Sequence, residues 1–121
     1  MRRLFIYGIT LGALAAHART INVADHGVVP GIDATYALNN LIRSVQNEEH
    51  VTLLFPEGKY DFRAENALER YRAVANHDNG LKRMIFPLFN HRNLTIDGGG
   101  STFMMHGRVV PVTAEGVNGL T

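Results

Sequence analysis

The chain has 121 residues, contains no cysteine and carries a formal net charge of +1. This length predicts one small domain, and the near-neutral charge gives no indication of a polyanionic partner such as a nucleic acid. The lack of cysteine excludes a disulfide framework. Hydrophobic residues make up 45% of the chain, which argues against a disordered protein.

The first eighteen residues have the pattern of a secretory signal peptide. A positively charged start, Met1-Arg2-Arg3, precedes LFIYGITLGALAA, an apolar run of 13 residues that is too short to span a bilayer comfortably. Ala16-His17-Ala18 then provides a cleavage site of the small-x-small kind. A buried N-terminal helix is the alternative interpretation. We expect cleavage after Ala18, a mature domain of residues 19–121, a periplasmic or secreted location, and no membrane association after cleavage.

The mature chain opens with a strand and a helix. An alternating segment around Ile21 and Val23 predicts the strand, which Gly27 and Pro30 interrupt. Asp33 is placed to act as the N-cap of the helix, because its carboxylate can accept from the free N–H groups of the first turn. Hydrophobic residues follow at helical spacing and predict about three turns with one buried face. They are Ala37, Leu38, Leu41, Ile42 and Val45.

Two short strands come next. The segment VTLLF at residues 51–55 is almost continuously hydrophobic, which is typical of a strand covered on both faces. Pro56 ends this strand because proline cannot donate a hydrogen bond to a sheet ladder. Tyr60 and Phe62 alternate with polar residues and indicate the second strand.

The rest of the chain is predicted to form further strands around one polar excursion. Residues 63–72 (RAENALERYR) are expected to hold one helical turn or more, and residues 76–80 (NHDNG) have the composition of a loop. Residues 84–89 (MIFPLF) form another hydrophobic strand, and residues 91–112 contain at least two more. The strands do not alternate with helices, which disfavours a doubly wound sheet. They are not joined by Asn-Gly hairpin turns either, which disfavours a meander.

A repeat suggests how the strands are arranged. Leu94-Thr95 recurs as Leu120-Thr121, 26 residues further along, and periods of roughly 20–50 residues are the signature of stacked repeats. The glycines at 98–100 allow a tight corner between two strands, because they adopt backbone conformations closed to residues with a Cβ. These features predict an all-β fold of stacked parallel coils, a parallel β-helix, with the helix near residues 33–45 covering its N-terminal end.

A stack of this kind needs a cap at each end, and no second cap is visible in the sequence. An open end would expose unpaired backbone groups and hydrophobic side chains. We therefore expect an incomplete solenoid: the N-terminal cap helix and first coils of a longer protein.

Several segments in a fixed order resemble known carbohydrate-active enzymes. They are INVADHGV, a D-x-T-x-x-L helix start (Asp33, Thr35, Leu38), FPEGKYDF, ANHDNG and NLTIDGGGSTFMMHGR followed by Val110-Pro111. In this order they resemble the start of right-handed parallel β-helix enzymes, and most of all bacterial α-1,3-galactosidases of the blood-group-B-cleaving family. FPEGKYDF and the strand around Asp97 are common to pectin-lyase-like proteins and indicate the fold only. NHD followed by HGR is more particular to the named family. The resemblance covers nearly all of the mature chain, but only an early part of a family member of several hundred residues.

The resemblance implies a glycoside hydrolase that releases terminal α-1,3-linked galactose with inversion and needs no cofactor. Inversion uses two carboxyl groups roughly 6.5–9.5 Å apart, one as acid and one as base. No position in this chain matches a catalytic motif. The catalytic residues are therefore expected beyond Thr121, and these 121 residues alone are expected to be inactive. The implied partner is a carbohydrate, the terminal galactoside of a glycan.

Five residues are candidates for substrate binding. Asn76, His77 and Asp78 place an amide, an imidazole and a carboxylate in one loop, where they could recognise sugar hydroxyls or simply shape the loop by local hydrogen bonds. His106 and Arg108 flank Gly107 after a hydrophobic strand, and residues two apart in a strand share a face. They could bind a sugar or hold a catalytic carboxylate, or pair with an acidic neighbour on the next coil.

Other polar features favour structural roles. Asp97 stands at the strand-to-glycine corner, where we expect it to accept hydrogen bonds from turn N–H groups. The histidines after the apolar run lack metal-ligand spacing, Asp97 alone is too little for calcium, and no Gly-Lys-Ser/Thr completes a phosphate loop. The sequence therefore predicts neither a metal site nor a cofactor, and it does not indicate an oligomeric state.

Two other functions stay open. One is a non-catalytic β-helix module that binds glycan or serves as structure, and the other is a pectin-degrading lyase or hydrolase with an acidic polymer as substrate. Sequence beyond Thr121 separates them. Paired aspartates on one face of further coils favour the galactosidase, coils without them favour the module, and a basic cleft with calcium ligands favours the pectin-degrading enzyme.

Overall fold

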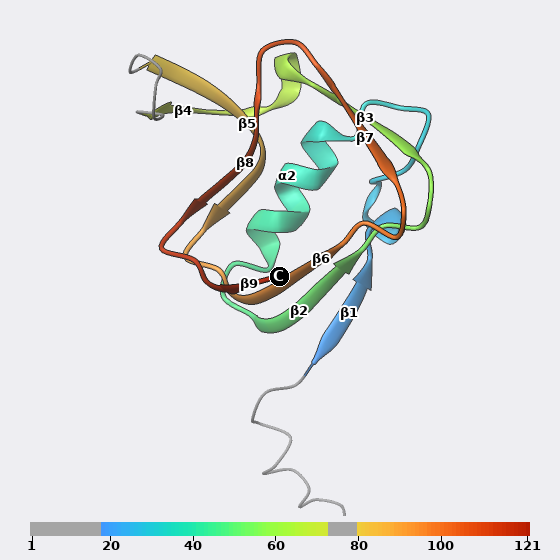
Figure 1. Cartoon of the computed structure of the whole chain (residues 1–121), viewed down its shortest axis with the longest axis vertical. Helices are drawn as coiled ribbons and strands as arrows, with labels where there is room; N and C mark the ends of the chain where they lie inside the picture. The colour runs from blue at the N-terminus through green and yellow to red at the C-terminus, as the bar shows by residue number, and fades with distance from the viewer. Residues whose placement is uncertain (1–17, 73–79) are drawn as a thin grey trace, which may run out of the picture.

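The structure is a computed structural model that describes residues 18–72 and 80–121 (Figure 1). The predicted signal peptide therefore lies, apart from Ala18, outside the described residues. Strands dominate, with one α-helix and two short 3-10 helices in the described part, which confirms the predicted all-β class. The elements are β1 (Arg19–Asn22), η1 (Val23–His26), α2 (Thr35–Ser44), β2 (Glu49–Leu54), β3 (Lys59–Arg63), η2 (Ala64–Asn66), β4 (Leu68–Arg72), β5 (Gly80–Phe89), β6 (Arg92–Asp97), β7 (Thr102–His106), β8 (Val110–Glu115) and β9 (Asn118–Leu120). No helix in this part of the chain is both long enough and hydrophobic enough to cross a membrane.

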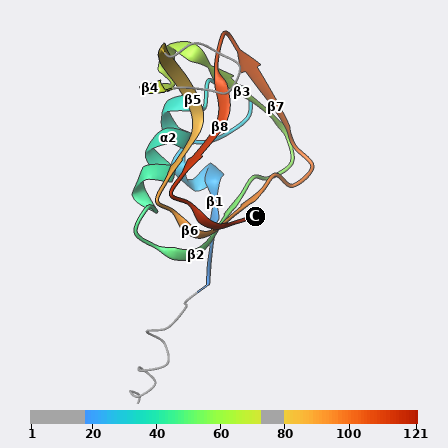
Figure 2. The same cartoon turned by 60° about the vertical axis from the view of Figure 1, so that its left-hand side comes forward.

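The strands form three sheets. Sheet A has the order β1-β2-β6-β9, sheet B pairs β3 with β7, and sheet C has the order β4-β5-β8. Every pairing is parallel except that of β4 with β5. Figure 1 shows α2 framed by the three sheets, and Figure 2 shows it beside them, so the helix covers one end of the space that the sheets surround.

The chain visits the three sheets in the same order twice. The first round is β2, β3 and β5, the second is β6, β7 and β8, and β9 then returns to sheet A. Leu53 pairs with Ile96, 43 positions on, whereas Leu94 pairs with Leu120, 26 positions on. The predicted 26-residue repeat is thus confirmed at the residues that indicated it. The first round is longer because β4 and its flanking residues lie within it.

The segment at residues 63–72 differs from the prediction. The expected helical turn is present as η2, but β4 follows it and pairs antiparallel with β5. This antiparallel pair departs from the parallel coils that the sequence predicted. Glu69 lies directly opposite Arg83 in this pair, and their side chains form an ion pair of 3.1 Å. Opposite charges that face each other across an antiparallel pair stabilise the pair. This stabilisation could not be predicted from the polar segment alone, because it depends on a partner in a distant strand.

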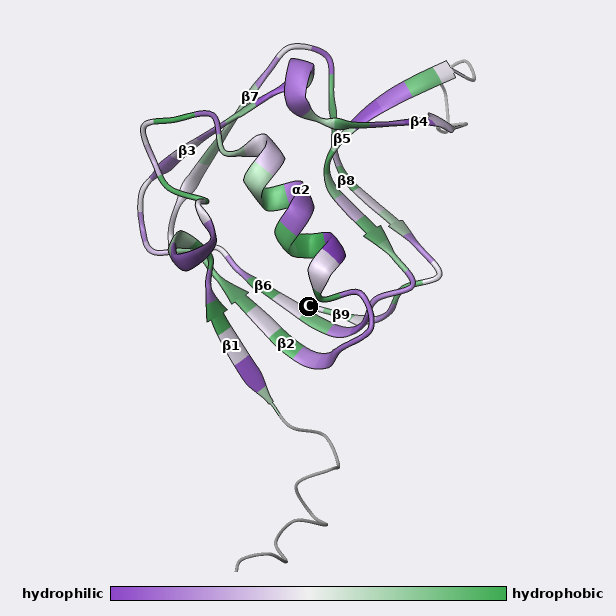
Figure 3. Ribbon diagram, turned by 180° about the vertical axis from the view of Figure 1, so that it is seen from behind, coloured by the Kyte–Doolittle hydropathy of each residue, from purple (hydrophilic) through white to green (hydrophobic). Residues whose placement is uncertain are grey.

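Inward-facing residues of all three sheets meet in one core beneath α2. Along β2 and just after it, alternate residues are buried, namely Val51, Leu53 and Phe55. Figure 3 shows hydrophobic and hydrophilic residues interspersed along the strands of sheet A and along the helix. Aromatic rings fill the centre, and the rings of Phe55 and Phe103 lie 4.9 Å apart between centroids. The helix contributes the predicted hydrophobic stripe, of which Leu38, Leu41, Ile42 and Val45 are buried.

Asp33 and Thr35 fix the start of α2. Asp33 lies one residue before the N-cap, Ala34, so the predicted cap is displaced by one position. Its Oδ1 accepts from the N–H of Thr35 at 3.1 Å and from the Thr35 hydroxyl at 2.6 Å. The Thr35 hydroxyl oxygen in turn accepts from the N–H of Arg63 at 2.7 Å, and the Asn66 amide donates to Asp33 Oδ2 at 2.6 Å. The helix start is thereby tied to β3 and η2.

Three side chains tie α2 to sheet C. The Asn39 amide donates to the Ile85 carbonyl at 2.8 Å and accepts from the Leu68 N–H at 2.9 Å. Gln46 donates to the Phe89 carbonyl at 2.7 Å.

The third of these side chains, His91, is only 2% exposed. Its Nδ1 accepts from the Phe89 N–H at 3.0 Å, and its Nε2 lies 2.8 Å from the Ile42 carbonyl. Because a backbone N–H only donates and a carbonyl only accepts, this arrangement assigns a neutral imidazole with its proton on Nε2.

The corner after β6 has the predicted chemistry. Gly99 and Gly100 have φ angles of +58° and +79°, and Asp97 Oδ1 accepts from the Gly99 N–H at 3.0 Å. Both the role of the glycines and that of Asp97 are confirmed. Gly99 also packs against the Phe55 carbonyl oxygen of the preceding round, with which a Cβ would collide.

Left-handed residues are stacked at other corners too. His50, Asn93 and Gly119 occupy matching positions in three successive strands of sheet A, with φ angles of 60°, 52° and 74°. Asn90 and Gly116 repeat this at the entry to the sheet, with φ angles of 59° and 63°. In each column the last residue is glycine, and a Cβ there would meet the side-chain oxygen of the asparagine below.

We predict that Gly99→Ala lowers the free energy of unfolding by about 2 kcal/mol or more, since it combines a left-handed backbone with a collision against the Phe55 carbonyl. Urea unfolding of the protein measures this. Gly80→Ala is the matched control, because a Cβ added at Gly80 would meet no atom within 4 Å and the φ of this residue is not in the left-handed region. An equal loss of unfolding free energy in the two variants would contradict the conclusion that Gly99 is required by its close approach to Phe55.

We also predict acid sensitivity at the start of α2. Partial burial raises the pKa of Asp33, but hydrogen bonds from the Thr35 hydroxyl, the Asn66 amide and the Thr35 N–H outweigh it and lower the pKa below 3.8. A carboxyl group whose pKa is lowered in the folded state stabilises the fold above its unfolded pKa, and this contribution disappears as the pH falls through the folded value. Between pH 6 and pH 2.5, Asp33→Asn should therefore lose less stability than the parent protein. Asp25→Asn, at an exposed carboxylate in η1, should behave like the parent.

Candidate functional site

Three of the five candidate residues cannot be placed. Asn76, His77 and Asp78 lie outside the described residues, in the segment that follows β4 and precedes β5.

His106 is the last residue of β7 and bonds to the neighbouring strand. Its Nε2 lies 2.8 Å from Asp61 Oδ1 on β3, and the two side chains are 34% and 27% exposed. Tyr60 and Phe62, on either side of Asp61, are buried, so Asp61 points to the outer face of sheet B. The Nδ1 atom of His106 has no partner among the described residues, which leaves one nitrogen to hydrogen-bond a ligand at this outer face.

Arg108 lies beyond the end of the strand. Because β7 ends at His106 and Gly107 has a φ of +95°, the two-residue period of a strand does not extend to Arg108. The prediction that His106 and Arg108 share one strand face is therefore not met. Arg108 is exposed and forms no ion pair with a residue in 18–72 or 80–121.

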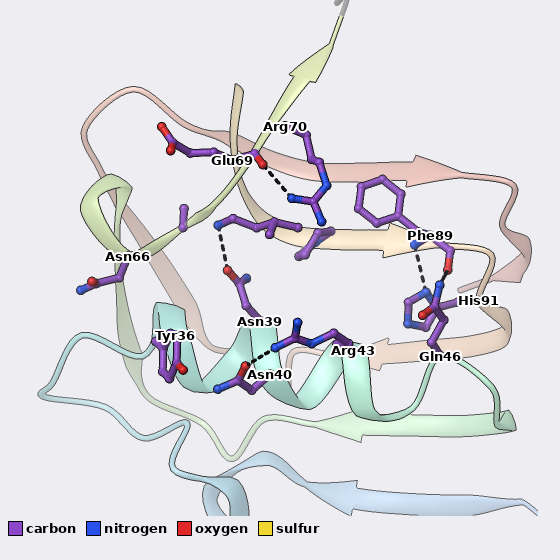
Figure 4. A pocket seen from close by; sticks show the side chains of 13 residues that line it. Tyr36, Asn39, Asn40, Arg43, Gln46, Asn66, Glu69, Arg70, Phe89 and His91 are labelled. Carbon is purple, nitrogen blue, oxygen red and sulfur yellow. Dashed lines mark hydrogen bonds between the residues drawn. The ribbon is translucent and has the colours of Figure 1, made fainter. Parts of the chain in front are cut away.

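A groove that the sequence analysis did not find lies between the outer face of α2 and the strands β4 and β5 (Figure 4). Its volume is about 460 Å³, within the range of roughly 300–1,000 Å³ that is common for small-ligand pockets. Residues from the helix form one wall, residues around β4 form the other, and β5 and the turn after it form the floor. The lining residues are Tyr36, Asn39, Asn40, Arg43, Gln46, Asn66, Ala67, Leu68, Glu69, Arg70, Pro87, Phe89 and His91.

The helix wall presents three side chains at positions i, i+4 and i+7. Tyr36 is 68% exposed, and Asn40 and Arg43 follow it along the polar face of α2. Arg43 Nη2 donates to Asn40 Oδ1 at 3.0 Å, which holds the two side chains together. This face is opposite the buried hydrophobic stripe, because residues three and four apart lie on one side of a helix.

The strand wall presents the guanidinium group of Arg70. Its Nη1 donates to the backbone carbonyl of Glu69 at 2.9 Å, and Figure 4 shows the side chain directed from β4 toward the helix. The Glu69 carboxylate instead binds Arg83. Within the described residues, neither Arg43 nor Arg70 has a carboxylate partner.

The floor of the groove is satisfied internally. Asn39, Gln46 and His91 use their polar atoms to tie α2 to sheet C. Other lining groups keep hydrogen-bonding capacity to spare, among them the Tyr36 hydroxyl, the Asn40 amide and the two guanidinium groups.

A second, smaller hollow of about 380 Å³ lies near the turn after α2 and the entry to sheet A. Its carboxylates are occupied, since Glu48 pairs with Arg19 at 2.7 Å and Glu49 pairs with Arg92 at 2.9 Å. No group of three His, Asp or Glu side chains that could hold a metal ion occurs in the described ranges.

The available signal for the groove was the polar face of the predicted helix. Tyr36, Asn40 and Arg43 recur at helical spacing, as the hydrophobic stripe does. The other wall could not be found in this way, because β4 itself was not predicted and only the folded chain brings Arg70 to the helix.

Comparison with known proteins finds several α-1,3-galactosidases. No protein-family model matches the chain. An α-1,3-galactosidase A from Shewanella woodyi is 35% identical over an alignment that covers 99% of this chain and 22% of that protein. An α-1,3-galactosidase B from Bacteroides thetaiotaomicron is 36% identical over 88% of this chain and 18% of that protein, and one from Phocaeicola vulgatus is 33% identical over 81% and 17%. The chain thus spans about a fifth of the length of the curated relatives it matches, and its similarity to them supports a relationship to the α-1,3-galactosidases, which are glycoside hydrolases.

Proposed function

We propose that the chain is the N-terminal part of an exported glycoside hydrolase that releases terminal α-1,3-linked galactose from glycans. The observation that carries this proposal is the 35% identity to the Shewanella woodyi α-1,3-galactosidase A across 99% of the chain. The proposed substrate is a carbohydrate, and the activity belongs to the longer protein of which these residues are a part.

The fold that we propose for the longer protein is a right-handed parallel β-helix that begins here. Parallel pairing within all three sheets supports it, as do the two rounds that meet the sheets in the same order. In this arrangement α2 covers the first coil, and β9 begins the third pass through sheet A. The role of these residues is then to close one end of the stack and to give the later coils a rigid start.

We place the two catalytic carboxyl groups beyond Thr121. An inverting enzyme needs one carboxylic acid and one carboxylate roughly 6.5–9.5 Å apart, with room for a water molecule between them. Several carboxylates of this chain are already bound to its own groups. Asp61 bonds to His106, Asp33 bonds to Thr35 and Asn66, and Glu69 bonds to Arg83. Their structural engagement supports the location of the chemistry in later coils.

We expect the full-length protein that contains these residues to release galactose from α-D-galactosyl-(1→3)-galactose, measured as free galactose over time. Because catalysis needs both carboxyl groups, the 121-residue chain alone should release none. A folded full-length protein without this activity would contradict the proposed function, and turnover by the chain alone would contradict the location of the catalytic residues.

A chimera tests whether residues 19–121 form the first coils of a stacked β-helix. Residues 19–121 replace the aligned segment of the Shewanella woodyi protein, and deletion of that segment provides the comparison. If the coils stack as proposed, the chimera stays soluble and active while the deletion variant does not. An insoluble chimera beside an active parent would contradict the proposed fold.

Export is proposed from the sequence alone. We expect the mature protein to begin at Arg19, because the small residues Ala16 and Ala18 fit the signal peptidase site. N-terminal sequencing of the protein from periplasm or medium measures this. Ala18→Leu should block cleavage and leave a larger, cell-associated precursor, whereas a mature protein that still begins at Met1 would contradict the proposal.

A further inference from the structure

We infer that the groove between α2 and the strands β4 and β5 is a non-catalytic binding site for an acidic sugar residue, one that carries a carboxylate or sulfate group. Two guanidinium groups without a carboxylate partner in the described ranges face one groove from opposite walls, Arg43 on the helix and Arg70 on β4. The site is separate from galactose release, which we place in later coils.

The charge of the groove selects an anion. Arg43 and Arg70 each bond to a neutral oxygen, an amide in one case and a backbone carbonyl in the other. Glu69 is the acidic residue in the lining, and its carboxylate is neutralised by Arg83. A guanidinium group binds carboxylate and sulfate oxygens through two parallel N–H donors, which makes such hydrogen bonds strong and directional.

The remaining groups suit the body of a sugar. Tyr36 offers an exposed ring face at the start of the helix, and Asn40 offers an amide that can donate to and accept from hydroxyl groups (Figure 4). Pro87 and Phe89 add a hydrophobic floor. The choice of a sugar as the body of the ligand rests on the proposed function, whereas the choice of an acidic group rests on the two arginines alone.

The groove is also shaped before any ligand arrives. Asn39, Gln46 and His91 fix the helix to sheet C with five hydrogen bonds of 2.7–3.0 Å, so its two walls are held at a set separation. A preformed site avoids the cost of ordering its side chains and backbone on binding.

The test is a direct titration of the mature residues 19–121, monitored by NMR shifts or calorimetry, with galactose 6-sulfate, galacturonate, galactose and sodium sulfate as separate probes. We expect the two acidic sugars to bind at least tenfold more tightly than galactose. Addition of 0.5 M NaCl should weaken their binding, because salt screens the charges. The double variant R43Q/R70Q should lose at least tenfold in affinity for the acidic sugars. R63Q removes an exposed arginine on sheet B, outside the groove, and should change affinity less than twofold.

A further variant separates a sugar site from a simple anion site. Tyr36→Ala should lower the affinity for galactose 6-sulfate severalfold and leave the affinity for inorganic sulfate unchanged, because only the sugar contacts the tyrosine ring. Binding of galactose as tight as that of the acidic sugars, equal affinities of the parent and R43Q/R70Q, or no binding of any probe would each overturn the inference. Inorganic sulfate that binds as tightly as galactose 6-sulfate would overturn the sugar part. None of these outcomes depends on galactose release, so the inference and the proposed function fail independently.

Discussion

Each round of this chain lies directly on the round before it. The rest of the structure depends on this close stacking, which is most restrictive at the turns between strands. Paired strands are separated by about 4.8 Å, so there is little room for a Cβ where the backbone turns into the left-handed region above another chain. Asparagine fits at one such position, Asn93 above His50. At four others a glycine of the later round lies over a larger residue, and a Cβ on it would come within about 3.0 Å of that residue. The pairs are Gly99 over Phe55, Gly107 over Ala64, Gly116 over Asn90 and Gly119 over Asn93.

The helix links the fold to the groove. One face of α2 closes the core with Leu38, Leu41 and Ile42, while its other face forms a wall of the groove. Because Asn39 and Gln46 are bonded to the backbone of sheet C or its neighbours, the helix cannot rotate to bury the polar face instead. The constraint that completes the core therefore also determines which side chains remain exposed to a ligand.

The sequence predicted the features that depend on local chemistry. The hydrophobic stripe of α2 follows from helical spacing, and the corner at Asp97 and Gly99 follows from the conformational freedom of glycine. The match of Leu94 with Leu120 could be recognised in the sequence, but the equivalence of the corner residues before them could not. Asn90 and Asn93 correspond to Gly116 and Gly119, and all four are residue types that tolerate a left-handed backbone. A sequence comparison finds this equivalence only if it treats glycine and asparagine alike, as residues that favour a left-handed backbone.

What the sequence did not predict depends on contacts between distant segments. The segment that forms β4 is polar and lacks a hydrophobic alternation, and it becomes a strand because Glu69 and the residues around it find partners on β5. His106 meets Asp61 only after a 43-position register places β7 beside β3. The groove needs both the helix and β4, so neither wall identifies it alone. The catalytic carboxyl groups lie outside any such comparison, since they are proposed for residues beyond this chain.

The unequal lengths of the two rounds, 43 and 26 positions, have an evolutionary consequence. Between sheets B and C, extra chain can be accommodated on the outside without altering the register of any other strand. A lineage can therefore gain, lose or exchange material at that junction while the underlying scaffold stays unchanged. Because β4 also forms one wall of the groove, a change in the length of this segment alters the groove and leaves the parallel strands in register.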